Sequence, residues 1–419
     1  MIDFFELFPF LVIVSVSVTS IYLIFTDRDK GASEGTGKIL QRLYFYLVSF
    51  VTLIMVGSGS TILIQFVLQE LFAENIMSSS TDKVALGTAL MVVGIPLWII
   101  HWRLIHQQIQ KSSWALSSQI RKIYKFLVLS VAISILAHSS TGIIQFLLNV
   151  KDSSWYQVAT LLPFTLIWIY HWRINDQTSN SHTKPIIRDI YIYFTSLIGL
   201  ILAANGVGAI LHHIFEYAYQ AITNVMIIVE PQNRIFSDSV RDNLSIAVTG
   251  IVLWGLHWLV LDNRKHVSRL KSAYLYGWAI LGGGVTGLVG ILMLLFTCLA
   301  FIFGVQNESN DIGPVPGGLT LLIIGVILFG YHRYIIRSPR RNEINNQNGL
   351  QVLDYSFCFL SLIISAIGIS TLTHLILTAI TGTGNEIVSE ENRWRVTTAF
   401  ALSSLFVGGS LWWYTWRYR

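Results

Sequence analysis

Two stretches of sequence decide the fold, Trp98-Ile99-Ile100-His101-Trp102-Arg103 and Trp168-Ile169-Tyr170-His171-Trp172-Arg173. Each one closes an apolar run of the length that an α-helix needs to cross the ~30 Å hydrocarbon core of a bilayer. Weaker copies of the same pattern close three later apolar runs, at 254–258, 329–333 and 412–417. The sequence therefore predicts tandem repeats, and each repeat is a membrane hairpin.

The composition excludes an ordinary soluble domain and a disordered chain. Apolar residues make up 53% of the sequence, charged residues only 12%, and the mean hydropathy is +0.59. We therefore predict an all-α, polytopic transmembrane protein of about eleven spans. The apolar runs long enough to span a bilayer lie near residues 8–25, 44–68, 85–102, 124–149, 156–172, 190–215, 244–261, 273–303, 318–335, 353–380 and 396–416.

The connections between the spans leave no room for a soluble catalytic domain. The longest runs from about Glu216 to Asn243, so any chemistry must take place within the helix bundle or at its rims. The first span begins with Asp3 and Glu6 and has no small-residue cleavage pattern after it. We interpret this span as a retained helix rather than a removed signal peptide.

The charges of the loops predict the orientation in the membrane. With eleven spans, one side of the membrane receives 22 of the 28 Lys and Arg but only 8 of the 23 Asp and Glu, a net charge of +14. The other side receives 6 basic and 15 acidic residues, a net charge of −9. Because basic loops stay in the cytoplasm, we expect an inner (plasma) membrane protein with its N-terminus outside and its C-terminus inside.

Each repeat begins with a basic residue followed by tyrosines. The first two starts are Arg42-Leu43-Tyr44-Phe45-Tyr46 and Arg121-Lys122-Ile123-Tyr124, and weaker ones follow near residues 188, 271 and 354. Aligning Tyr44 with Tyr124 also superposes Gln65-Phe66 on Gln145-Phe146, so the first two repeats are the most alike. We predict an anchor helix with a basic loop over 1–39 and five hairpins that share one direction, over 40–110, 119–178, 187–266, 268–342 and 350–419.

The hairpin ends are predicted to be anchors at the inner membrane interface. Trp and Tyr prefer the headgroup level, and Arg just beyond them can reach lipid phosphate. Basic residues near the surface also attract anionic headgroups, by about 1 kcal/mol each. The expected partners are therefore a bilayer with anionic headgroups on the cytoplasmic side and other membrane proteins, but no nucleic acid. The predicted anchors are Trp98, His101, Trp102, Arg103, Trp168, His171, Trp172, Arg173, Trp254, His257, Trp258, His332, Arg333, Trp412, Trp416 and Arg417.

The repeats resemble an uncharacterised bacterial family of integral membrane proteins, a domain of unknown function found in tandem copies. Its copies begin with Arg-x-x-Tyr and end with Gly-x-Pro-x-Trp-x-x-His-Trp, and residues 94–102 are the best match to that ending. The resemblance covers about residues 40–419. The later repeats depart from the pattern, since Leu259 replaces the Arg, Phe329 the first Trp and Thr415 the His. The family carries no activity that could be transferred.

Four histidines recur at one depth, His101, His171, His257 and His332. Paired axial ligands of a membrane haem would lie at such positions on neighbouring helices, so a haem- or quinone-binding protein is one hypothesis. The alternative is that His is an interface residue that suits the negative end of the helix dipole. We favour the alternative, because bis-histidine sites usually lie deeper and the fifth repeat has no such His. No cofactor or metal is therefore expected.

The outward helices carry small and polar residues at mid-span. Gly, Ser and Thr let membrane helices approach closely, so most of these segments are expected to be packing surfaces. The functional alternative is a polar path for a channel or transporter, because a strongly polar group at membrane depth is a site hypothesis by default. No Asp or Glu lies near the centre of a span, which disfavours ion coupling. The candidate path residues are Ser58, Thr61, His138, Thr141, Asn205, His212 and His374.

Known catalytic patterns are absent from the sequence. It contains no His-Glu-x-x-His motif, no phosphate-binding Gly-rich loop with Lys, no Gly-x-Ser-x-Gly elbow and no Cys-x-x-Cys pair. We therefore expect no enzyme. The favoured role is a scaffold or accessory subunit of a membrane assembly, and the channel and the haem or quinone protein remain as alternatives.

Overall fold

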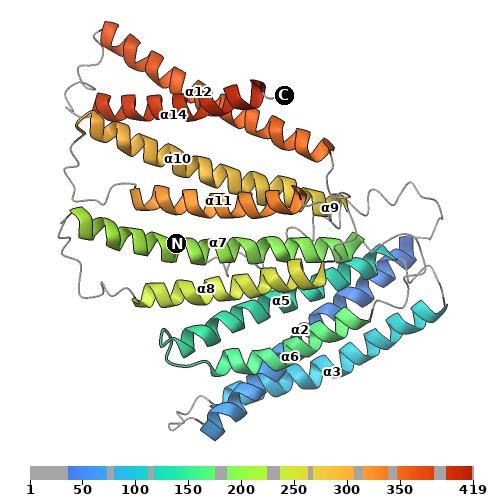
Figure 1. Cartoon of the computed structure of the whole chain (residues 1–419). Helices are drawn as coiled ribbons and strands as arrows, with labels where there is room; N and C mark the ends of the chain where they lie inside the picture. The colour runs from blue at the N-terminus through green and yellow to red at the C-terminus, as the bar shows by residue number, and fades with distance from the viewer. Residues whose placement is uncertain are drawn as a thin grey trace. The chain divides into compact units, whose positions relative to one another are not determined.

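The computed structural model describes residues 36–72, 80–111, 118–174, 186–223, 236–262, 268–305, 315–337, 347–381 and 393–417 (Figure 1). Within these residues every regular element is a helix, which confirms the all-α prediction. The predicted first span and the loop centred on Glu230 lie outside the described residues. The helices are α2 (Thr36–Phe72), α3 (Ser80–Lys111), α5 (Gln119–Leu147), α6 (Trp155–Arg173), α7 (Ile186–Thr223), α8 (Asp238–Trp254), α9 (Arg269–Ser272), α10 (Leu281–Ile302), α11 (Val315–Arg337), α12 (Gln347–Thr381) and α14 (Arg393–Arg417).

Two of these helices continue through π-helical segments. α8 runs directly into η2 (Gly255–Leu261), and α9 runs through η3 (Ala273–Ile280) into α10. In each case the residue at the junction keeps right-handed helical dihedral angles, so the chain remains one continuous rod. The described helices therefore pair with the predicted spans from the second to the eleventh.

Nine of the described helices are long and apolar enough to cross a membrane, and the chain is a multi-pass membrane protein. α6 is not among the nine, although it has 19 residues. Its ends are occupied by Trp155 and Tyr156 on one side and by Tyr170, His171 and Trp172 on the other. Such ring-bearing residues suit the membrane interface, but they lower the average hydropathy of the helix.

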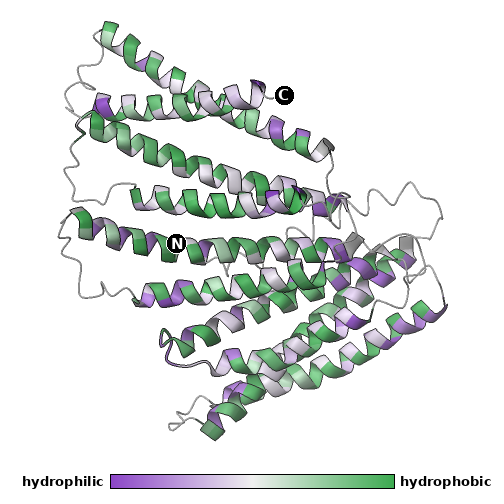
Figure 2. Ribbon diagram, in the orientation of Figure 1, coloured by the Kyte–Doolittle hydropathy of each residue, from purple (hydrophilic) through white to green (hydrophobic). Residues whose placement is uncertain are grey.

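The outward helices extend beyond the hydrocarbon layer. α2, α7 and α12 have 37, 38 and 35 residues. At 1.5 Å per residue each is about 55 Å long, well above the ~30 Å of a bilayer core. Hydrophobic residues fill the middle of the helices and hydrophilic residues gather toward their ends (Figure 2). The overhanging turns can therefore reach the interface and the water on either side.

The first compact unit (Met1–Thr195) is organised around α2. α2 packs against α3, α5 and α6, and α5 also packs against α6. A buried core joins α2, α3 and α5 through Tyr46, Leu53, Ile105, Tyr124 and Val128, and the partly buried Ile167 of α6 packs against it. The core lies where α2 and α5 begin and α3 ends, which is the predicted inner end of the hairpins.

The second compact unit (Ser196–Arg419) is a series of helix pairs. Small residues join the remainder of α7 to α8, α10 pairs with α11, and α12 pairs with α14 (Figure 1). α10 also contacts both α12 and α14. Each pair is a hairpin formed by two helices that are consecutive in the chain.

Glycines set the close approach within these pairs. A Cβ at Gly250 would overlap the backbone of Leu202 and Ala203, and a Cβ at Gly325 would overlap the backbone of Gly287. Lipid offers no hydrophobic driving force between helices, so close backbone contact is what stabilises the pair. The small-residue segments that contain these glycines are therefore packing surfaces.

Candidate functional site

The ring-bearing residues at the predicted inner end form a cluster in the first unit. It consists of Trp102 from α3, Tyr124 from α5, and Tyr170 and His171 from α6, and we call it the first cluster. The ring centroid of Trp102 lies 5.7 Å from that of Tyr124 and 5.8 Å from that of His171. Three helices of two successive hairpins therefore meet in one group of rings.

The imidazole of His171 is held from both sides. Its Nδ1 lies 2.9 Å from the carbonyl oxygen of Ile167, one turn earlier in α6. Because a carbonyl can only accept, Nδ1 donates this bond, and Nε2 is left to accept from the hydroxyl of Tyr124 at 3.1 Å. The side chain is only 2% exposed. His171 therefore joins the two helices of its hairpin through a buried hydrogen bond.

Trp102 joins one hairpin to the next. Its indole Nε1 donates to the hydroxyl of Tyr170 at 2.6 Å. Trp98, one turn earlier, stacks on Trp102 with ring centroids 6.0 Å apart and planes 12° from parallel. Residues four apart share a helix face, which explains why the pattern places its two Trp at this spacing.

The second unit repeats this arrangement in its second cluster, which consists of Trp258, Tyr274, Tyr331 and His332. The Nε1 of Trp258 donates to the hydroxyl of Tyr331 at 3.2 Å. The hydroxyl of Tyr274 lies 3.4 Å from Nε2 of His332, and Nδ1 of His332 lies 2.8 Å from the carbonyl oxygen of Leu328. One Trp, two Tyr and one His therefore make the same hydrogen bonds in both clusters.

Further Trp–Tyr bonds extend the network. Trp168 donates to the hydroxyl of Tyr191 at 2.7 Å, and Trp254 donates to the hydroxyl of Tyr274 at 3.0 Å. In each case the indole belongs to the end of one hairpin and the phenol to the start of the next. Indole and phenol groups need such partners when they leave water.

The four repeated histidines are buried, and their predicted role as interface anchors stays a prediction. His101, His171, His257 and His332 are 8%, 2%, 0% and 0% exposed. All four place Nδ1 at 2.8–2.9 Å from the carbonyl oxygen four residues earlier. A buried imidazole needs hydrogen-bond partners, and for His171 and His332 the tyrosines Tyr124 and Tyr274 of the facing helices supply them.

The other predicted anchors fall into three groups. Trp258 is buried as well, at 3% exposure. Half-buried are Trp98, Trp102, Trp168, Trp172, Trp254, Arg333 and Trp412. Exposed are Arg103, Arg173, Trp416 and Arg417. Contact of the predicted anchors with headgroups stays a prediction.

The second cluster differs from the first in its helical geometry. His257 and Trp258 lie in the π-helical segment η2, and Tyr274 lies in η3. Stacked pairs of Trp four residues apart occur at Trp98 and Trp102 and again at Trp412 and Trp416. Trp168 also stacks on Trp172 and donates to Tyr191 from a regular α-helix, so the bond from Trp254 to Tyr274 is kept in spite of the wider turns.

A buried ion pair lies beside the second cluster. Lys271 Nζ lies 2.7 Å from Asp262 Oδ2, and the two side chains are 1% and 4% exposed. The ammonium also lies 5.7 Å from the ring centroid of Trp258. Lys271 is therefore held by a carboxylate and by the face of an aromatic ring.

A small cavity occupies the corresponding place beside the first cluster. Its volume is about 20 Å³, room for roughly one water-sized group. Basic side chains reach it from α3 and α5, and the buried His171 reaches it from α6. Its principal lining residues are Tyr46, Trp102, His106, Arg121, Lys125 and His171.

The residues of the candidate polar path lie partly on the surface and partly buried within the helices. The side chains of His138, Asn205, His212 and His374 are exposed. Thr61 and Thr141 are buried, but their hydroxyls donate to the carbonyl oxygens four residues earlier, at 3.0 Å in both cases. Ser58 is half-buried. The polar path therefore stays a prediction.

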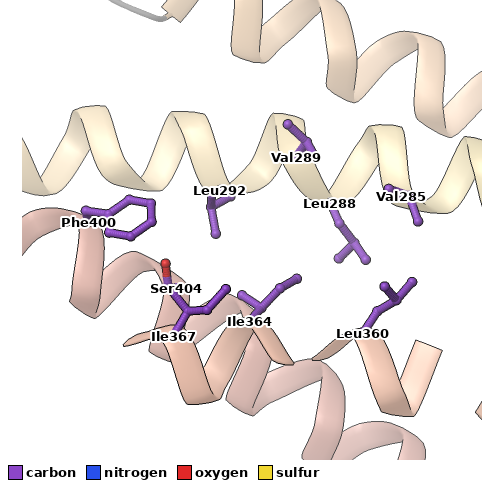
Figure 3. A pocket seen from close by; sticks show the side chains of 9 residues that line it. All are labelled: Val285, Leu288, Val289, Leu292, Leu360, Ile364, Ile367, Phe400 and Ser404. Atoms are coloured by element: carbon purple, nitrogen blue, oxygen red, sulfur yellow. The ribbon is translucent and has the colours of Figure 1, made fainter. Parts of the chain in front are cut away.

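A larger pocket in the second unit is almost entirely apolar (Figure 3). It has a volume of about 170 Å³ and lies between α10, α12 and α14, and the hydroxyl of Ser404 is its one polar side-chain group. The side chains that line it are Val285, Leu288, Val289, Leu292, Leu360, Ile364, Ile367, Phe400 and Ser404. Such a lining offers nothing to an ion or to a catalytic step.

The histidines are also poorly arranged for a metal. Among the described residues, no group of three or more His, Cys, Asp or Glu is placed to hold a metal ion. Ligation by His171 would require the Nε2 bond to Tyr124 to break. The geometry of the first cluster therefore favours a structural role for this histidine over axial ligation.

A sequence profile described as a domain of unknown function, DUF5671, matches the chain twice, at residues 42–152 and at 189–311. Together the two matches cover more than half of the chain. The chain belongs to the DUF5671 family. This confirms the predicted membership of a domain family of unknown function with tandem copies. No curated protein and no solved structure matches the chain.

The two DUF5671 copies begin at the first and the third predicted hairpins, so each match spans one hairpin and the first helix of the next. In both copies the Trp-x-x-His-Trp pattern precedes the tyrosine that bonds a later histidine. These tyrosines are Tyr124 and Tyr274. The two DUF5671 matches therefore align the first hairpin with the third. The two clusters follow the same repeat.

Proposed function

We propose that this protein is a non-enzymatic membrane scaffold or accessory subunit, in which the two clusters lock successive hairpins at their inner ends. The proposal rests on the hydrogen bonds that the polar ring atoms of the first cluster make. The indole of Trp102 and the imidazole of His171 bond to tyrosines of neighbouring helices. Groups that hold a framework in this way are not available as nucleophiles, bases or ligands.

The two alternatives have less support. A polar path would have to use His138, Asn205 and His374, whose side chains are exposed on the helices. A haem site would need imidazoles that are free to turn toward iron, and the bond from Tyr124 competes with that. The scaffold role requires none of the hydrogen bonds in the two clusters to break.

The proposal is tested by isolating the protein from its native membrane in mild detergent. We expect it to migrate in native electrophoresis as a complex with at least one other membrane protein, identified by mass spectrometry. A variant with both Trp102→Phe and Trp258→Phe, which lacks both inter-hairpin indole bonds, should lose the partner more readily than Trp413→Phe. Migration alone as a monomer would contradict the scaffold, and a Soret band in the purified sample would support the haem alternative instead.

A further inference from the structure

One ring contact recurs between successive hairpins. The second Trp of the pattern that closes a hairpin packs on the tyrosine at the start of the next hairpin. The three pairs, with the distances between their ring centroids, are Trp102 and Tyr124 at 5.7 Å, Trp172 and Tyr191 at 5.8 Å, and Trp258 and Tyr274 at 4.9 Å. The same contact is therefore made at three successive junctions.

The tyrosine at the start of a hairpin also meets the histidine near the end of its own hairpin. The rings of Tyr124 and Tyr274 lie 5.7 and 5.9 Å from those histidines. In the first hairpin the ring of Tyr44 lies 5.6 Å from that of His101. Tyr44 therefore takes the place of the start tyrosine in the first hairpin.

The Trp side of the contact is not filled at Tyr44. Among the described residues no Trp ring packs on Tyr44, and its side chain is 54% exposed, compared with 5% for Tyr124 and 2% for Tyr274. Residues 1–35, which precede the described part of the chain, contain no Trp. The segment before the first hairpin therefore cannot supply this ring.

The fifth hairpin carries the other half of the contact. Trp416 is the second Trp of its pattern and stacks on Trp412, with ring centroids 6.1 Å apart and planes 15° from parallel. No other ring of the described residues packs on Trp416, whose side chain is 66% exposed, whereas Trp258 is 3% exposed. The described helices therefore present an uncovered indole on α14 and an uncovered phenol on α2.

We propose that the fifth hairpin of one copy of this chain binds the first hairpin of a second copy, with the ring of Trp416 on that of Tyr44. The contact is the one that the chain already makes at three junctions, and the indole N–H and the phenol hydroxyl provide a donor and an acceptor. Both residues lie at the predicted inner ends of their hairpins. Two copies with the same orientation therefore present them at the same depth in the membrane.

Two different surfaces meet in this contact, so it is heterologous. Such a contact adds copies head to tail and produces a ring or an open row. The inference goes beyond the scaffold role and does not rest on it, because self-association is measured on the purified chain without any other protein.

The test cross-links two differently tagged copies of the full chain that are produced together in one membrane. Both carry Cys298→Ser and Cys358→Ser, so that one introduced cysteine is the only thiol of each copy. One copy carries Tyr44→Cys and the other carries Trp416→Cys. The reagent is a short bis-maleimide, because Cα atoms more than about 7 Å apart cannot form a disulfide directly. The matched control uses Tyr414→Cys instead of Trp416→Cys, since Tyr414 is 61% exposed and lies on the opposite side of α14.

We expect a product that carries both tags with Trp416→Cys, and none above background with Tyr414→Cys. In liposomes that contain only the purified chain, energy transfer between labelled copies measures the association itself. Trp416→Ala and Tyr44→Ala should each weaken it by about tenfold, through the loss of an aromatic pair and its hydrogen bond. Tyr414→Ala should stay within about twofold of the wild type. A circular dichroism melt checks the fold of each variant, and Tyr44→Ala tests the same contact if Trp416→Ala does not fold.

The proposal is overturned if no product carries both tags, or if Tyr414→Cys cross-links as well as Trp416→Cys. It is also overturned if Trp416→Cys cross-links to itself as efficiently as to Tyr44→Cys, which would indicate a symmetric contact. A chain with both cysteines should form products longer than dimers. Cross-linking only within one chain would contradict the second copy. The absence of any other membrane protein in native electrophoresis would contradict the scaffold and leave this contact unaffected, so the two failures are distinguishable.

Discussion

Tyr124 shows what a single hydroxyl contributes to the hairpins. Its bond to Nε2 of His171 is buried between α5 and α6. In Tyr124→Phe the imidazole keeps its place but loses this partner, and an unpaired buried polar group costs about 1 to 2 kcal/mol. We expect that loss in the free energy of unfolding, measured by denaturant titration in detergent micelles.

The control for this prediction is Tyr44→Phe, at the equivalent start of α2. The side chain of Tyr44 is 54% exposed, and its ring lies 5.6 Å from that of His101. Removing its hydroxyl should change the stability by less than about 0.5 kcal/mol. A double variant of Tyr124→Phe with His171→Phe should lose less than the two single variants added together, because neither partner is left unpaired. Additive losses would show that the bond is not formed.

Asp262 provides a second test at the residue scale. Asp262→Asn leaves the Lys271 ammonium buried without its carboxylate, which is expected to cost about 3 to 5 kcal/mol. Asp238→Asn is the matched control, since Asp238 pairs with Arg241 but its side chain is 79% exposed. That surface pair should contribute no more than about 1 kcal/mol. Thermal unfolding compares the two, and equal shifts would refute the burial of the Asp262–Lys271 pair.

The sequence identifies the members of the site but not their partners. The Trp/His/Trp pattern and the tyrosines of the hairpin starts are both visible as repeats. That Tyr124 faces His171 depends on how two helices pack, and that Trp102 reaches Tyr170 depends on which hairpins are neighbours. Burial of the histidines follows from those contacts. Periodicity along one chain carries no information about these contacts, so the sequence alone does not predict them.

At the scale of the element, the close glycine contacts determine how α10 and α11 pair. Gly325→Ala would place a methyl group against the backbone of Gly287, where no flexible side chain can move aside. We expect a loss of about 1 to 3 kcal/mol from overpacking. Gly330→Ala, in the same helix, meets no atom within 4 Å and should be neutral or slightly stabilising. Thermal unfolding of the two variants is the measurement, and equal losses would argue against this contact.

The helices themselves are largely predictable, because the requirement for a long apolar run is strict in lipid. The predicted span at 85–102 lies inside α3, which extends to Lys111. The extra turns are amphipathic or charged and lie beyond the apolar window. The π-helical turns at η2 and η3 had no sequence signal. Hydropathy therefore finds the helices and misses their ends and irregular turns.

At the scale of the whole molecule, the duplication has diverged in charge while keeping its framework. Both copies retain the Trp, Tyr and His positions that join hairpins. The position after the pattern became His106 in one copy and Asp262 in the other. The framework of hydrogen bonds is therefore repeated while the polar residues beside it differ.

The charge asymmetry of the loops leads to a prediction for the whole chain. The side with a net charge of +14 should face the cytoplasm, because translocating Lys and Arg is disfavoured. In a background with Cys298→Ser and Cys358→Ser, single cysteines are introduced as Ser79→Cys, before α3, and Ser112→Cys, after it. A membrane-impermeant maleimide applied to intact spheroplasts should label the Ser79→Cys variant but not the Ser112→Cys variant. After permeabilisation it should label both variants. The reverse pattern would place the end of α3, and with it the first cluster, on the outer side and would refute the predicted orientation.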